Sequence, residues 1–184
     1  MTAGYRQELH AKAAAPSSLP KAPPPARCQN LGRDEWRDFQ EAQFELFGEG
    51  AWVSVVNDAK ASDGVAAVMP GNSPQWAVQL QLMASDVFTP TVAVFASVKV
   101  QAKAKSGPAF AWGVHDCAAG RAVVTRTVSL AEVADAEYHE YSLGEVSWKP
   151  GMSIWFAPPN DGNRVESVAV DRVYIEAVRE ETKP

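Results

Sequence analysis

The 184-residue sequence has no long apolar run, no cluster of basic residues and very little cysteine. A membrane-spanning helix needs about 20 consecutive apolar residues, and no stretch of the chain approaches that length. Lys and Arg together number 17 against 22 Asp and Glu, and the net charge is −5. We therefore expect neither a membrane nor a nucleic acid as a partner. The first 15 residues are too polar to resemble the apolar region of a secretory signal.

The two cysteines, Cys28 and Cys117, are far apart and form no Cys-x-x-Cys motif. They therefore indicate neither a zinc site nor a redox centre. Whether they form a disulfide stays open, because pairing cannot be deduced from sequence alone.

Several enzyme motifs are also missing: there is no G-x-S-x-G, no H-E-x-x-H and no P-loop. His115, Asp116 and Cys117 follow one another. Adjacent strand residues point to opposite faces, so we do not expect them to form a nucleophile–base pair with each other. Nothing in the sequence demands an enzyme.

Residues 1–35 are predicted to be an N-terminal extension or linker. Within them, AKAAAPSSLPKAPPPAR (11–27) holds five of the 13 prolines and almost no large apolar side chain. Such a composition disfavours both an α-helix and pairing in a β-sheet, and it favours an extended chain. We expect one folded domain at 36–178 and a charged tail at 179–184.

The domain has the pattern of an all-β protein, because short apolar runs alternate with turn sequences such as ASDG, PGNSP, KSGP and PNDGN. About ten strands in this arrangement predict an antiparallel β-sandwich or jelly roll. The expected strands cover residues 39–47, 52–58, 64–71, 76–82, 91–103, 109–116, 122–130, 137–143, 152–159 and 168–178.

The first of these stretches, FQEAQFELF (39–47), alternates polar and apolar residues. In a strand, Glu41, Gln43 and Glu45 would point to the same side. Three interpretations are compatible with this row of oxygen-bearing side chains: a solvated edge strand, a pair of catalytic carboxylates, or a metal site.

Three stretches in order along the chain carry a likeness to a known family: QEAQFE, NDAKASDGVAAVMPGNSPQWAVQLQL and VAVDRVYIEAV. They resemble the galactose-binding-like jelly roll of carbohydrate-binding modules, especially families six and thirty-five. The likeness covers about residues 39–178. The matching positions are Glu41-Ala42-Gln43, Gly64, Trp76, Asp171 and Tyr174.

The resemblance implies a structural calcium held by Glu41, Gln43 and Asp171, with backbone carbonyls of NDAKASDG completing the shell. Calcium accepts such a mixture, because it takes about 6–8 oxygen ligands of either kind. The family has a second glutamate where this chain has Gln43, so the site has one negative charge fewer.

The resemblance also implies a sugar site among loops at one end of the sandwich. Its residues would be Tyr138 as the stacking platform, with Asn72, Asn160 and Asn163 as hydrogen-bonding amides. Turn chemistry alone is the rival explanation for PNDGN. Of the tryptophans, we expect Trp112 and Trp155 in the core, because both lie within apolar strands.

These expectations combine into a non-catalytic carbohydrate-binding module with an oligo- or polysaccharide as ligand. It would be an accessory domain tethered to a catalytic domain, within a larger secreted or periplasmic protein. The alternative is a structural or protein–protein interaction domain on the same fold. An exposed aromatic surrounded by amides would favour sugar binding, and a flat apolar sheet face would favour docking.

Overall fold

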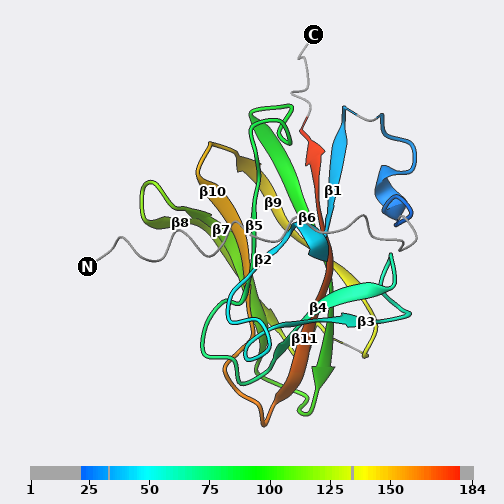
Figure 1. Ribbon diagram of the computed structural model, residues 1–184, viewed down its shortest axis with the longest axis vertical. Coiled ribbons are helices and arrows are strands. Elements are labelled where there is room, and N and C mark those ends of the chain that lie inside the picture. The colour runs from blue at the N-terminus through cyan, green and yellow to red at the C-terminus, as the bar shows by residue number, and fades with distance from the viewer. Residues whose placement is uncertain (1–21, 33, 134, 179–184) are drawn as a thin grey trace.

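The computed structural model describes residues 22–32, 34–133 and 135–178. Two antiparallel sheets pack face to face, as Figure 1 shows, with the five-stranded sheet on the left and the six-stranded sheet on the right. The strands are β1 (Trp36–Gln40), β2 (Glu45–Leu46), β3 (Ser54–Asn57), β4 (Val65–Pro70), β5 (Val78–Gln81), β6 (Thr91–Ala102), β7 (Pro108–Asp116), β8 (Arg121–Ser129), β9 (His139–Ser147), β10 (Met152–Ala157) and β11 (Val165–Ala177). Two 3-10 turns are η1 (Ala26–Cys28) and η2 (Glu41–Gln43).

The six-stranded sheet has the order β3-β4-β11-β6-β9, and β1 pairs with β11. The five-stranded sheet has the order β2-β5-β10-β7-β8. Neighbouring strands in each sheet come mostly from distant parts of the sequence, and every ladder is antiparallel. The predicted all-β antiparallel sandwich is therefore confirmed.

The core lies between the sheets because alternate residues of each strand point inward. On β10, Met152, Ile154 and Phe156 are all buried. The Phe156 ring stacks on Trp112, with centroids 5.3 Å apart, and Trp112 is fully buried as predicted. Full burial of one such side chain stabilises the fold by about 1.5–3 kcal/mol.

The stretch FQEAQFELF is not one strand, so that prediction was wrong. β1 ends at Gln40, the 3-10 turn η2 follows, and a two-residue β2 begins at Glu45. The Gln43 amide oxygen accepts a hydrogen bond from the Gln40 N–H at 3.1 Å. This cap stabilises the turn, and the backbone change separates the side chains of Glu41, Gln43 and Glu45 that a strand would have aligned.

Part of the expected linker packs on the domain. The turn η1 brings Cys28 onto the six-stranded sheet, where only 1% of it is exposed. Cys28 and Cys117 are both free thiols, the first buried and the second exposed, so they form no disulfide. The described residues contain no helix that is long and apolar enough to cross a membrane.

Candidate functional site

The three asparagines predicted to bind sugar come together at one end of the sandwich. The Asp161 N–H donates to the Gly71 carbonyl at 2.8 Å, which joins the turn before β11 to the end of β4. A Cβ on Gly162 would lie 3.2 Å from the Cβ of Asn72, so the two loops are in contact. Asn72, Asn160 and Asn163 are all exposed there.

Tyr138 lies elsewhere. It directly precedes His139, the first residue of β9. Across the sheet, His139 lies in one row with Val98, Val170 and Ala67, and Ala67 is three residues before the end of β4, where the asparagines lie. The Tyr138 hydroxyl donates to Asp58 Oδ2 at 2.9 Å, and Lys99 Nζ lies 4.8 Å from the ring centroid. Burial and the hydrogen bond to Asp58 hold the pKa of Tyr138 well above its usual range. The ring is therefore half-buried on the sheet, not an open platform beside the asparagines.

The residues predicted to bind calcium are only partly brought together. Glu41 is 6% exposed and Asp171 is 3% exposed. Asp171 Oδ1 accepts hydrogen bonds from the Ser62 N–H at 2.8 Å and the Ser62 hydroxyl at 2.7 Å. Gln43 is exposed and its amide oxygen is already hydrogen-bonded, so it is not part of this buried group.

Two further carboxylates, Asp38 and Asp63, join Glu41 and Asp171 to form what we call the acidic cluster. Burial first, and then the charges of Asp63 and Asp171, raise the pKa of Glu41. Burial likewise raises the pKa of Asp38. The nearby cation is Arg172, 3.6 Å from Asp38 and 3.7 Å from Asp171.

One oxygen of Glu41 and one of Asp38 are buried without a hydrogen-bond partner among the described residues. Such orphaned acceptors are costly, and a bound cation would satisfy them. No three acidic, histidine or cysteine side chains of the described residues are arranged to hold a metal by themselves. Backbone carbonyls would have to supply most of a cation's ligands, as calcium accepts.

A second feature lies on the outer face of the five-stranded sheet. There a hollow of about 410 Å³ opens between strands β5, β10, β7 and β8. We call it the Trp155 hollow. Its lining residues are Trp76, Gln79, His115, Cys117, Ala122, Ser153 and Trp155.

Trp155 faces this hollow and not the core, so the prediction of a core Trp155 was wrong. Its inward neighbours on β10, Ile154 and Phe156, are both fully buried. Trp76 is 40% exposed and packs against Phe47, with ring centroids 5.4 Å apart. Two indoles that are only partly covered therefore lie at the same hollow.

The polar groups that line the Trp155 hollow are the Gln79 amide, the His115 imidazole, the Cys117 thiol and the Ser153 hydroxyl. Gln79 is paired with Trp155 across strands, and His115 is paired with Ser153. The Cys117 thiol lies 3.5 Å from the Ser153 hydroxyl. His115 and Cys117 both line the hollow and therefore share a face. The rule that directly adjacent strand residues point to opposite faces does not apply to this pair, because the two residues are two positions apart. The lining contains no Asp, Glu, Lys or Arg.

Gly113 flanks Trp155 on the neighbouring strand β7, and Thr125 follows on β8. A Cβ on Gly113 would lie 2.3 Å from the Val124 carbonyl oxygen, well inside contact distance. The two backbones therefore approach closely at this point. As a result, the sheet surface beside the Trp155 indole is bare of side chain.

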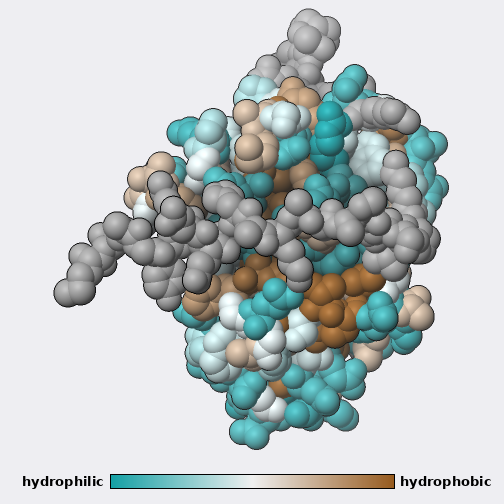
Figure 2. Space-filling model, in the orientation of Figure 1, coloured by the Kyte–Doolittle hydropathy of each residue, from teal (hydrophilic) through white to brown (hydrophobic). Residues whose placement is uncertain are grey.

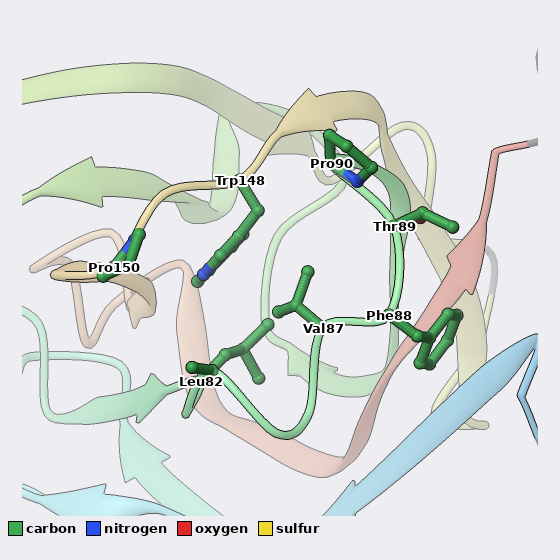
Figure 3. Close-up of a pocket in the computed structure, with 8 residues that line it drawn as sticks. Leu82, Val87, Phe88, Thr89, Pro90, Trp148 and Pro150 are labelled. Atoms are coloured by element: carbon green, nitrogen blue, oxygen red, sulfur yellow. The ribbon is translucent and has the colours of Figure 1, made fainter.

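A second hollow, of about 320 Å³, lies where the loop after β5 meets the turn before β10. In Figure 3 the Trp148 indole points between Pro150 and Val87 toward Leu82, while Phe88 points away. The Thr89 hydroxyl is engaged with the Thr91 carbonyl at 2.6 Å. This hollow is nearly all apolar, so it lacks the convergent polar groups of the Trp155 hollow.

The sequence matches no protein-family model and no curated protein. Solved structures do match its fold. The CBM22-1 xylan-binding domain of Paenibacillus barcinonensis Xyn10C superposes with a TM-score of 0.52 at 18% identity, covering 77% of this chain and 89% of that one. The C-terminal family 22 carbohydrate-binding module of Clostridium thermocellum Xyn10B gives 0.51 at 14% identity, with 74% and 87% covered.

The Podospora anserina GH26-CBM35 β-(1,4)-mannanase gives a TM-score of 0.51 at 11% identity, covering 81% of this chain and 29% of that one. The chain has the jelly-roll fold of carbohydrate-binding modules. Identities this low establish the fold and leave the ligand to be argued from the chain's own residues.

Proposed function

We propose that the chain is a non-catalytic carbohydrate-binding module and that the Trp155 hollow binds a neutral sugar. The observation that carries the proposal is the pair of partly exposed indoles, Trp76 and Trp155, in a hollow that also offers an amide, a hydroxyl and an imidazole. Indole faces bury the C–H face of a pyranose, while Gln79, Ser153 and His115 replace hydrogen bonds that the sugar makes to water.

The absence of Asp, Glu, Lys and Arg from the lining favours a neutral sugar. A uronic acid carboxylate would lose its hydration in the hollow without gaining an Arg or Lys partner. Each neutral hydrogen bond contributes only about 0.5–1.5 kcal/mol. We therefore expect a dissociation constant between about 0.1 and 1 mM, where 1 mM corresponds to about −4 kcal/mol.

Binding this weak suffices for a tethered module, because tethering raises the effective concentration of a neighbouring domain at its polymer. The module in the Podospora anserina mannanase belongs to such a longer enzyme, which supports this arrangement. The same proposal includes a larger secreted or periplasmic parent protein. Xylan, named for the module of Paenibacillus barcinonensis Xyn10C, is the first polysaccharide to test.

The test is calorimetric titration of the full chain with neutral xylo- and manno-oligosaccharides and with acidic oligosaccharides. Trp155→Ala should weaken binding at least about tenfold, equal to about 1.4 kcal/mol, while Trp155→Phe keeps part of it. The fold should survive both changes, because the side chain lies outside the core.

The loop end that carries Asn72, Asn160 and Asn163 stands as a rival location, and Asn72→Ala is the matched variant for it, because Tyr138 lies elsewhere. Loss of binding in Asn72→Ala with retention in Trp155→Ala would move the site there. If neither variant changes the binding of any oligosaccharide, the Trp155 hollow is not the site.

A docking role is the second candidate, and one observation favours it. Every residue of the edge strand β3 is exposed, including Val55 at 43% and Val56 at 39%. Figure 2 shows hydrophobic surface over β3 and β4. An apolar edge without charged residues invites pairing with another chain. Complete failure of every oligosaccharide and polysaccharide to bind would favour this candidate.

We also propose that a calcium ion binds at the acidic cluster. Glu41 and Asp171 would hold it, with nearby backbone carbonyls as the further oxygen donors. The support is electrostatic: four neighbouring carboxylates have one guanidinium, Arg172, close by. A divalent cation would neutralise the excess and satisfy the orphaned oxygen of Glu41.

A further inference from the structure

The segment 22–32 lies on the outer face of the six-stranded sheet, and we call it the N-terminal strap. Figure 1 shows it, in blue, beside β1 and outside the sandwich. It joins neither sheet as a strand. Within the strap, Pro25 and Cys28 are buried against the sheet, whereas the residues around them are mostly exposed. The strap is therefore held by side chains, in the manner of a bound peptide.

Arg27 is the centre of this contact. Its guanidinium carbon lies 3.7 Å from the Phe95 ring centroid. Nε is 2.7 Å from Glu176 Oε1, and one terminal nitrogen donates to Glu140 Oε1 at 3.2 Å. Tyr174 stacks on Phe95 at 5.1 Å and donates to Glu140. An aromatic floor with two carboxylates thus surrounds a single cation, which is a geometry suited to arginine.

Two more contacts fix the direction of the strap. Arg172 donates to the Pro23 carbonyl at 2.8 Å. Cys28 packs with Phe95 and Tyr174, and Leu31 contacts the same group. This small cluster is separate from the main core between the sheets. Detaching the strap would therefore break the cluster and the arginine contacts and leave the sandwich core and its ladders complete.

We propose that this face is a docking surface for an arginine-bearing, proline-led segment, and that its partner is a second copy of this chain. The fit is demonstrated by the strap itself, and every copy carries both the segment and the surface. Exchange of straps between two copies is then reciprocal, and it buries the same groups in both. Within one copy the strap has a high effective concentration, so the closed monomer dominates unless that internal match is broken.

Charge exchange of one contact tests the surface. In the full chain, Arg27→Glu and Glu176→Arg should each lower the melting temperature, because each places like charges together. The double variant should restore it. Restoration establishes that the strap docks through this pair, whereas a double variant as unstable as the single variants would overturn the docking.

Mixing the two single variants tests the exchange. Each variant is mismatched alone. In the mixture, the strap of the Arg27→Glu variant is complementary in charge to the surface of the Glu176→Arg variant. The unchanged strap of the Glu176→Arg variant is likewise complementary to the unchanged surface of the Arg27→Glu variant. At several hundred micromolar, where trans contacts compete with cis ones, light scattering should show dimers in the mixture and monomers in each variant alone.

A mixture that stays monomeric would overturn the exchange. The control is Arg126→Glu mixed with Glu132→Arg, since this ion pair lies within one stretch of chain and its arginine is 38% exposed, close to the 42% of Arg27. Dimers in that mixture as well would also overturn it, because they would come from non-specific charge pairing.

Discussion

Replacing Glu41 by Gln should have opposite effects on stability with and without calcium. The carboxylate is buried among Asp63 and Asp171, and its Oε2 has no partner among the described residues. An unpartnered buried acceptor costs about 1–3 kcal/mol, and like charges nearby add to this cost. In chelator, Glu41→Gln removes the charge and should stabilise the fold by about 1 kcal/mol, or about 2–4 °C in melting temperature.

With calcium the order reverses. An ion at a hundredfold excess over its dissociation constant stabilises the native state by about 2.7 kcal/mol. For a domain of this size that raises the melting temperature of the wild type by about 5–10 °C. Glu41→Gln loses one charged ligand, so its response should be much smaller, and the two proteins should exchange rank.

Thermal unfolding followed by circular dichroism, in EGTA and in calcium, measures both effects. Glu45→Gln is the matched control, because Glu45 is exposed and lies just four residues on. It should behave as the wild type in both buffers. A wild-type melting curve that calcium does not move, together with no gain in stability for Glu41→Gln in chelator, would refute the reasoning about the acidic cluster.

Three further predictions follow from single contacts. In chelator, the raised pKa values of Asp38 and Glu41 mean that the folded state binds protons more tightly than the unfolded state. The free energy of unfolding, measured in urea, should therefore include a stabilising contribution that is fully present below about pH 4 and is lost as the pH rises through the folded pKa values. Glu41→Gln should make this pH dependence smaller. Gly71→Ala should destabilise the fold by at least about 1–3 kcal/mol in chemical denaturation, because its Cβ would lie 1.9 Å from the Val165 carbonyl oxygen; unchanged stability would contradict this. Iodoacetamide should label Cys117 and spare Cys28, since burial raises the pKa of the Cys28 thiol to about 12, and a bound oligosaccharide should slow that labelling; equal rates with and without sugar would place the ligand outside the Trp155 hollow.

The strands from β4 to β11 were predictable because their apolar residues alternate between clear turn sequences. The same alternation contained the signal for Trp155: Met152, Ile154 and Phe156 are in phase, so Ser153 and Trp155 had to face outward. Counting Trp155 among the core residues gave hydrophobicity more weight than phase. The outer-face hollow was predictable in principle for this reason.

Other features depended on contacts between distant residues. The turn at Glu41–Gln43 is fixed by a local cap that competes with strand formation, and alternation cannot reveal which wins. Tyr138 is held on the sheet by Asp58, 80 residues away. Docking of Cys28 depends on Phe95 and Tyr174, which no local property of a proline-rich segment indicates.

The close approach of β7 and β8 at Gly113 limits how this surface can diversify. Every side chain at position 113 would collide with the Val124 carbonyl, so any replacement must first open the ladder. A library built to change ligand preference would lose its folded members at this position. Gln79 pairs with Trp155 on one side, and Thr125 pairs with Gly113 on the other. Changing these two side chains leaves the backbone pairing intact, so these positions offer the practical route to altered ligand selectivity.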